Sequence, residues 1–165
     1  MSQPLPQSND DWTDAPAPAR VRPFEGQLRP VVAVAVGGAL GALARWGVGI
    51  VLPTPRGGFP LGTFAINVVG CLLIGALIVA ITELVDTHPL VRPFVASGFL
   101  GGFTTFSAYS IDIELLLIGG HVGIALGYLA ATLAAALLAT WAGMVLARAM
   151  GSSGSGRVGS GRVAR

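Results

Sequence analysis

Charged side chains are scarce in this chain. Only 11% of its 165 residues are charged, its 10 basic residues are all arginine, and Cys71 is its single cysteine. Soluble domains carry charge on about a quarter of their residues, so the composition excludes an ordinary soluble protein. One cysteine cannot form a disulfide within the chain, and we interpret Cys71 as a small packing residue.

Residue patterns for catalysis are also absent from the sequence. It has no His/Cys cluster with metal-ligand spacing, no phosphate-binding glycine loop and no nucleophile with a base in reach. The two histidines, His88 and His121, fall in predicted loops. We therefore expect that the protein is not an enzyme. The arginines, most of them in the tails, suit anionic lipid head groups better than nucleic acid.

Long uncharged runs fill the middle of the chain. Hydrophobic residues make up 53% of the sequence and the mean hydropathy is +0.73. A helix needs about 20 apolar residues to cross about 30 Å of hydrocarbon. The runs predict four membrane-spanning helices, at 31–52, 61–84, 90–118 and 122–148, in an all-α multi-pass protein.

The two tails differ from this membrane domain in composition. Residues 1–30 carry prolines and scattered acids, and residues 151–165 are a Gly/Ser/Arg repeat, so both are predicted to be disordered. The first tail lacks the basic start and apolar core of a secretory signal. We expect direct insertion into an inner membrane.

Residues 101–110, GGFTTFSAYS, interrupt the third span with glycines and hydroxyl side chains. In lipid every backbone N–H and C=O needs a partner, so a broken helix is tolerated where it lines a cavity or binds an ion. Gly101 and Gly102 lower the cost of a break, which we predict at 101–105. Carbonyls freed there suit a cation.

Helical spacing predicts two neighbouring stripes on this span. The rings are Phe99, Phe103, Phe106 and Tyr109, and the hydroxyls are Thr104, Ser107 and Ser110. Ring edges carry positive partial charge and hydroxyls donate hydrogen bonds, so together they can attract a small dehydrated anion. An aromatic stripe can also pack a core, but the glycine pair and the Thr-Thr step favour a pathway.

Other polar residues in the spans each have two interpretations. Asn67 either bonds helices together or offers its NH₂ group to a passing anion. Tyr128 and Thr132, one turn apart, either extend a polar track or bond to backbone. Arg45 lies near one end of the first span, where a guanidinium can reach water.

Four spans are too few to enclose a wide pore easily, which favours an oligomer. Gly37 and Gly41 form a GxxxG pattern that permits close helix packing. The last span continues a ridge of small residues: Gly119, Gly123, Gly127, Ala131, Ala135, Ala139 and Gly143. The pattern fits packing within the chain and packing between subunits equally well.

Three segments resemble, in order and spacing, the signatures of the Fluc, or CrcB-type, fluoride ion channels of bacteria. They are GGALGALARW at 37–46, GTFAINVVG at 62–70 and GFLGGFTTFSAYS at 98–110. The resemblance covers residues 31–148. It implies a fluoride-selective passive channel that exports cytoplasmic fluoride and reduces its toxicity. It also implies an antiparallel dimer of four-helix subunits with a structural sodium ion at the dimer interface.

The resemblance further implies roles for single residues. The sodium ligands are the backbone oxygens of Gly101 and Thr104, and Arg45 stands near the mouth of the pore. The fluoride pathway comprises Asn67, Phe106, Tyr109, Ser110, Tyr128 and Thr132. The family commonly has phenylalanine where this chain has Tyr109, so the phenolic hydroxyl is an addition.

Two other function classes fit a membrane protein of this size. A proton-coupled exporter of the small multidrug resistance type needs a carboxylate in its first span, and residues 31–52 have none. A non-transporting membrane assembly subunit would leave the broken helix without a purpose.

Positive charge is unevenly distributed between the two sides of the predicted topology. Four spans place both termini and the loop at 85–91 on one side. That side holds Arg20, Arg22, Arg29, Arg92, Arg148, Arg157, Arg162 and Arg165, and the other side holds Arg56. The positive-inside rule then favours both termini in the cytoplasm. As the alternative to a homodimer, we hypothesise a heterodimer with a related subunit of opposite orientation.

Overall fold

The computed structural model describes residues 27–84 and 88–154, and all regular secondary structure within those ranges is helical. Three helices are long and apolar enough to cross a membrane. They are α1 (Leu28–Val51), α2 (Leu61–Val79) with its π-helical extension η2 (Ala80–Leu84), and α5 (Val122–Gly154). The tails predicted to be disordered lie mostly outside the described residues, although α1 begins at Leu28 and α5 continues to Gly154.

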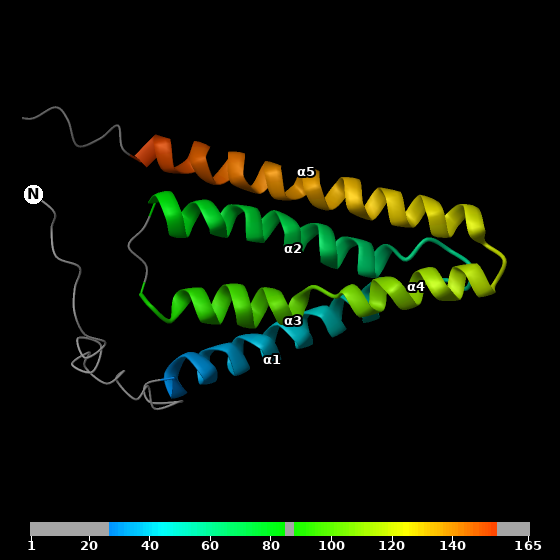
Figure 1. Ribbon diagram of the computed structural model, residues 1–165, viewed down its shortest axis with the longest axis horizontal. Coiled ribbons are helices and arrows are strands. Elements are labelled where there is room, and N and C mark those ends of the chain that lie inside the picture. The colour runs from blue at the N-terminus through cyan, green and yellow to red at the C-terminus, as the bar shows by residue number, and fades with distance from the viewer. Residues whose placement is uncertain (1–26, 85–87, 155–165) are drawn as a thin grey trace, which may run out of the picture.

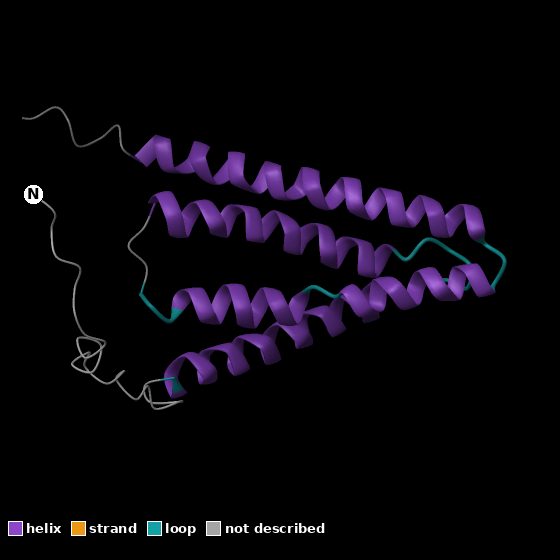
Figure 2. Cartoon of the chain, in the orientation of Figure 1, coloured by secondary structure: helices purple, strands orange, loops and turns teal. Residues whose placement is uncertain are grey.

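The third predicted span is made of shorter helices. The π-helix η3 (Pro93–Leu100) continues into α3 (Gly101–Phe103), and α4 (Phe106–Ile118) follows after a break. The break appears as a short loop between α3 and α4 in Figure 2. It lies within the predicted range of 101–105.

Threonines, and not the glycine pair, form this break. Gly101 has ordinary helical angles, φ −63° and ψ −35°, so the expectation that the glycines mark the broken turn is wrong. Thr104 (ψ 159°) and Thr105 (φ −151°, ψ 123°) are extended. Thr104 Oγ1 donates to Leu100 O at 2.9 Å, and Thr105 Oγ1 accepts from Ala108 N at 3.1 Å as the N-cap of α4. Adjacent hydroxyls thus close one helix and open the next.

The first helix packs closely against η3 and α3. A Cβ on Gly41 would overlap the Phe99 carbonyl oxygen, and one on Gly102 would overlap the Gly38 carbonyl oxygen. The GxxxG pair Gly37 and Gly41 therefore serves packing within this chain, where small residues let two backbones approach. For α1, the structure therefore decides between packing within the chain and packing between subunits, in favour of packing within the chain.

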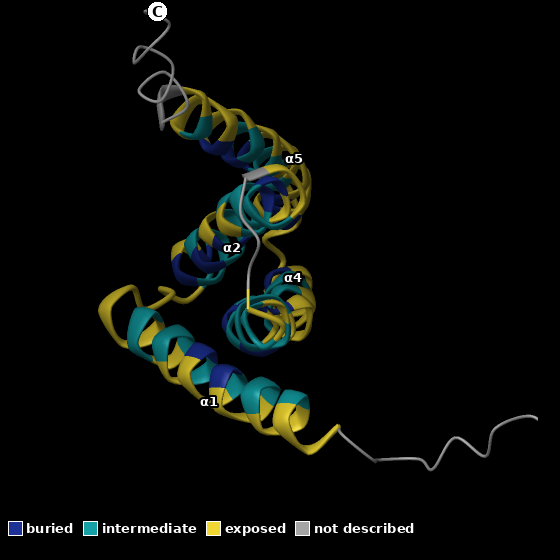
Figure 3. Cartoon of the chain, turned by 90° about the vertical axis from the view of Figure 1, so that its left-hand side faces the viewer, coloured by how far each residue is buried: buried dark blue, intermediate teal, exposed yellow. Residues whose placement is uncertain are grey.

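The second helix packs along α5, and Figure 3 shows buried residues where the two face each other. A Cβ on Gly75 would overlap the Thr140 carbonyl oxygen, and one on Gly143 would overlap that of Leu72. Gly123 and Gly127 of the predicted ridge, in contrast, have open space at the Cβ position.

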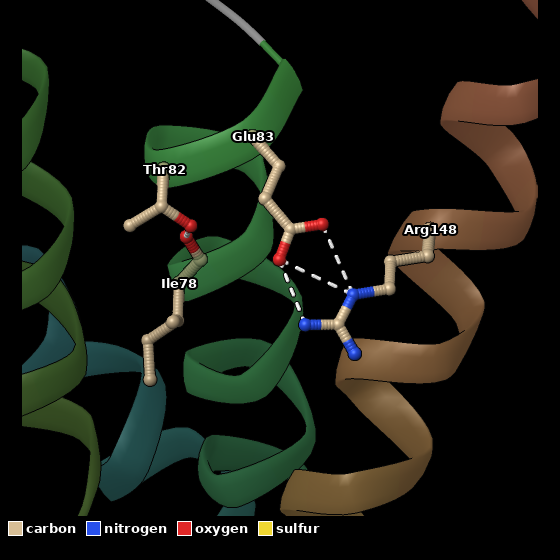
Figure 4. A network of polar contacts seen from close by, with 4 residues as sticks. All are labelled: Ile78, Thr82, Glu83 and Arg148. Carbon is tan, nitrogen blue, oxygen red and sulfur yellow. Dashed lines mark hydrogen bonds and ion pairs between the residues drawn. The ribbon is translucent and has the colours of Figure 1, made fainter.

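Near the ends of these helices Arg148 Nη2 donates to Glu83 Oε1 at 2.7 Å, and Arg148 Nε donates to Glu83 Oε2 at 3.0 Å (Figure 4).

The ends of the described helices agree with the predicted topology. In Figure 1 the start of α1, the end of η2, the start of η3 and the end of α5 lie at the same end of the molecule. The loop at 52–60 and the turn at 119–121 lie at the other end. Gly120, with φ 78°, ends α4 there. The Gly120 N–H donates to Leu117 O, and the His121 N–H donates to Leu116 O.

Large apolar side chains cover much of the outer surface. Leu43, Leu133 and Trp141, for example, are 60–62% exposed. A water-facing surface of this kind would aggregate, whereas lipid tails or a partner subunit can cover it without cost. The distribution of burial is that of a membrane protein.

Candidate functional site

An open groove of about 590 Å³ runs beside the break. It is lined by α2, by the end of η3, by α3, by the two threonines of the break, by the first turn of α4 and by α5. Six of the residues predicted from the sequence line it: Asn67, Gly101, Thr104, Phe106, Tyr109 and Thr132. The fold thus brings together most of the predicted site from segments far apart in sequence.

Asn67, on α2, forms hydrogen bonds with the backbone of Thr105 at the break. Its Oδ1 accepts from the Thr105 N–H at 2.9 Å, and its Nδ2 donates to the Thr105 carbonyl oxygen at 3.0 Å. In an unbroken α-helix the Thr105 N–H would bond to Gly101 O. Of the two interpretations of Asn67, the structure therefore shows the one in which the amide bonds helices together, and one amide hydrogen of Nδ2 remains for a further acceptor.

Arg45 reaches the same break from α1. Its Nη1 donates to the Thr104 carbonyl oxygen at 3.1 Å, and the contact is partly buried. The expectation that this guanidinium extends to water at the end of the first span is wrong. Arg45 lies six residues before the end of α1, and the close packing of α1 on α3 places its guanidinium beside the break.

The rings do not form one stripe. The prediction assumed a continuous helix, and the break separates Phe99 and Phe103, which stack at 6.0 Å, from the later pair. Phe103 is buried, whereas Phe106 is 80% exposed in the groove. The stripe predicted from spacing is therefore wrong as a single feature.

A second run of rings leads from the groove toward the loop end. Phe106 contacts Tyr109 with centroids 5.9 Å apart, Tyr109 contacts Tyr128 at 5.2 Å, and Tyr128 meets Phe59 edge to face at 5.2 Å. The Tyr109 hydroxyl donates to Leu129 O at 3.3 Å. Its hydrogen is therefore engaged by backbone, and Tyr109 presents its ring to the groove much as a phenylalanine would.

Two buried hydroxyls on α5 have no hydrogen-bond partner among the described residues. Thr132 Oγ1 belongs to a groove-lining residue that is 7% exposed, and the hydroxyl of Tyr128, one turn before it, is fully buried. Tyr128 lies near Thr63 and Asp112 without hydrogen-bond geometry to either. Buried donors are normally satisfied, so these two atoms have free capacity for water or an ion.

Ser110 is placed differently from the rest of the predicted pathway. Its hydroxyl donates to Phe106 O at 3.0 Å on the exposed side of α4. Within the described residues it does not line the groove.

A second cavity, of about 450 Å³, lies at the loop end of the molecule. The loop at 54–60, the last turns of α4 and His121 surround it, and Asp112 lines its inner side. Asp112 Oδ2 is buried without a hydrogen-bond partner in the described part of the chain. Of the three unpartnered oxygens, that of Thr132 thus belongs to the lining of the groove and that of Asp112 to the lining of this cavity, and Tyr128 lies near Asp112.

Comparison with known proteins decides the family. Residues 32–144 match the model of a family described as CrcB-like protein, Camphor Resistance (CrcB). The chain belongs to the CrcB-like family. A relative named "Fluoride-specific ion channel FluC 2" from Streptomyces avermitilis is 49% identical over 135 residues, covering 81% of this chain and 85% of the relative. "Fluoride-specific ion channel FluC 1" from Streptomyces coelicolor is 54% identical over 113 residues, covering 68% and 73%.

A third relative supports the same assignment. "Fluoride-specific ion channel FluC 2" from Nocardia farcinica is 51% identical over 130 residues, covering 79% of this chain and 89% of the relative. The family resemblance read from three sequence segments is confirmed. With three helices long and apolar enough to span, this CrcB-like chain is a multi-pass membrane protein.

Sequence reasoning missed one residue of this CrcB-like site. Thr105 is buried, caps α4 and offers both its backbone groups to Asn67. A threonine directly before a helical run was the available signal, because Ser and Thr favour the N-cap position. The expectation from the sequence connects the break with the flexibility of Gly101 and Gly102 and gives Thr105 no role of its own.

Proposed function

We propose that this chain is a subunit of a fluoride-selective passive channel that exports cytoplasmic fluoride and reduces fluoride toxicity. The names of its relatives support the substrate. The observation that carries the mechanism is the run of rings from Phe106 through Tyr109 to Tyr128, next to buried hydroxyls with free hydrogen-bonding capacity.

Fluoride holds its water tightly, so a selective pathway must replace that water with several weak contacts in succession. Ring edges supply positive partial charge, and the hydroxyls of Thr132 and Tyr128 supply hydrogen-bond donors. The remaining hydrogen of Asn67 Nδ2 adds an amide donor at the groove. None of these groups carries a fixed charge, so each can release the ion again. Ser110 stays in the proposed pathway only as the family resemblance implies, because its hydroxyl bonds to Phe106 O outside the groove.

Passive flow through such a site needs no energy source. Fluoride enters cells as its neutral weak acid and dissociates in the cytoplasm, so an anion pathway open down the gradient lets it leave. The CrcB-like assignment disfavours the exporter and assembly-subunit alternatives, because the relatives are named as channels.

The proposed assembly is an antiparallel dimer of four-helix subunits in the bacterial inner membrane. In each subunit η3, α3 and α4 would together make the fourth crossing. The groove is open along one side, and the exposed ring of Phe106 would face lipid in a single subunit. A second subunit, either a copy of this chain or a related chain of opposite orientation, would close the pathway.

A sodium ion between the subunits also belongs to the proposal, with the backbone oxygens of Gly101 and Thr104 as its ligands. The donor set fits a hard monovalent cation. Gly101 O loses its α-helical donor because the Thr105 N–H bonds to Asn67. The two proposed ligand residues, Gly101 and Thr104, both line the open groove. Thr104 O accepts from Arg45, which leaves one of its two lone pairs. The ion would supply positive charge that holds the two broken helices together.

Fluoride efflux from liposomes tests the function. Vesicles that contain only this purified chain should release fluoride down its gradient at a rate proportional to protein content, and should retain chloride. The release should need neither ATP nor a proton gradient. Protein-free vesicles are the control. Equal rates for fluoride and chloride, or a dependence on a proton gradient, would refute the proposal.

A further inference from the structure

We propose that Arg45 is a positioning residue of the channel, whose guanidinium orients the peptide group at the break and thereby the ring of Phe106. This inference rests on the proposed function. It differs from the place that the family resemblance implies for Arg45, near the mouth of the pore, where a charge would act by attracting ions.

The first step is the identity of the atoms that are held. The carbonyl of Thr104 and the N–H of Thr105 belong to the same peptide group. Arg45 Nη1 bonds to its oxygen at 3.1 Å, and Asn67 Oδ1 bonds to its nitrogen at 2.9 Å. One peptide plane is therefore fixed at both poles, by side chains from α1 and from α2.

The second step is the reason that this peptide needs such contacts. Its neighbours are extended, so no helical hydrogen bond restrains its rotation. Phe106 follows directly as the first residue of α4, so the orientation of the peptide sets the direction in which α4 leaves the break. An exposed ring with few packing contacts of its own depends on that backbone direction.

The third step is how α1 delivers the guanidinium. Gly41, one turn before Arg45, lies against the backbone of Phe99 and Phe103, where any Cβ would overlap. This close approach brings the next turn of α1 to the break. No carboxylate among the described residues forms an ion pair with Arg45, so the Thr104 carbonyl is the partner that the structure assigns to it.

The chemistry of arginine suits this task. A bond from a charged donor is roughly twice as strong as one between neutral groups, and it gains further where water is scarce. The planar guanidinium is preorganised, so it restrains direction as well as distance. A lysine at this position would keep the charge and lose that restraint.

Ionic strength distinguishes the two roles of Arg45. The effect of a charge at a water-filled mouth is screened, because the Debye length falls from about 30 Å in 0.01 M salt to about 3 Å in 1 M salt. A partly buried hydrogen bond to backbone is screened far less. We therefore compare fluoride efflux of the whole chain and of its variants in liposomes at these two salt concentrations.

Arg45→Met keeps an apolar stem and removes the donors. We expect fluoride efflux about tenfold below that of the unsubstituted chain at both salt concentrations, as estimated for the loss of a charge-assisted bond. Arg45→Lys should recover part of the rate. Arg29→Met, an exposed arginine at the start of the same helix, is the control and should stay within about twofold at high salt.

Amide hydrogen exchange gives a readout that does not depend on conduction. The segment 101–110 of Arg45→Met should exchange faster than in the unsubstituted chain and in Arg29→Met, because the Thr105 N–H is less firmly held. If Arg45→Met does not fold, Arg45→Lys takes its place in both measurements, with a smaller loss at both salt concentrations.

The outcomes separate the two proposals. If the unsubstituted chain alone releases no fluoride, the proposed function fails for this chain as a homodimer, and hydrogen exchange of segment 101–110 still tests the role of Arg45. If the chain releases fluoride and the Arg45→Met deficit disappears in high salt, Arg45 acts as an ion attractor and the inference is wrong. Unchanged exchange of segment 101–110 in the variant overturns the inference as well.

Discussion

Asn67 and Thr105 are joined by two hydrogen bonds, one in each direction, although 38 residues separate them in the chain. The pair replaces, at one point, the helical hydrogen bonds that the break removes. A side-chain amide is suited to this because it carries a donor and an acceptor side by side, as a peptide group does. The site therefore depends on α2 holding the segment at 93–118 in its broken form.

Asn67→Ala should destabilise the protein. The substitution leaves the N–H and C=O of Thr105 without partners, and each such group costs about 1–3 kcal/mol. Thermal unfolding in detergent should shift to lower temperature, and fluoride efflux should fall. Asn67→Asp keeps the acceptor but, when ionised, loses the donor and places a charge against the Thr105 carbonyl oxygen, so it should be at least as unstable as Asn67→Ala. Lost efflux with unchanged unfolding temperature would mean that Asn67 only contacts the ion.

Gly102→Ala should be more harmful than Gly101→Ala. A Cβ on Gly102 would overlap the Gly38 carbonyl oxygen, so α1 would have to move, at about 1–3 kcal/mol for overpacking. The nearest atom to a Cβ on Gly101 is Ala96 O at 4.0 Å. Unfolding temperatures of the two variants provide the comparison. Equal losses would contradict the assignment of the close contact to Gly102.

Phe106→Ile should lower fluoride efflux by about tenfold, since an aromatic contact is worth about 0.5–1.5 kcal/mol. The ring is 80% exposed, so folding of the subunit should be unaffected. Phe99→Ile is the control, because it makes the same change in a ring that stacks on Phe103 and does not line the groove. Normal efflux by Phe106→Ile would show that the exposed ring only packs against lipid or a partner.

The orientation of the chain can be measured in cells. Positive residues concentrate on the side of the termini, although Arg148 is partly neutralised by its pair with Glu83. We expect most copies to keep the C-terminus in the cytoplasm. Labelling of Ser160→Cys in a Cys71→Ala background should occur only after permeabilisation. Comparable labelling from both faces would establish dual insertion and a homodimer, and the heterodimer hypothesis would have to be dropped.

Much of the fold was predictable from local sequence. Uncharged runs of membrane length specify helices, because in lipid a helix satisfies its own backbone within one segment. The positions of three long helices, the existence of a break within 101–105 and the family all followed from residues close together in the chain. Asn67, Phe106, Tyr109 and Thr132 were likewise found from residue type and spacing.

The tertiary structure decided what depends on distant partners. Gly101 and Gly102 looked like the break because glycine is flexible, yet they stay helical, and Gly102 lies where α1 packs against α3. The break lies at Thr104 and Thr105, whose backbone groups find Arg45 and Asn67 at separations of 59 and 38 residues. A local pattern cannot reveal such bonds, because only helix packing brings their atoms within reach.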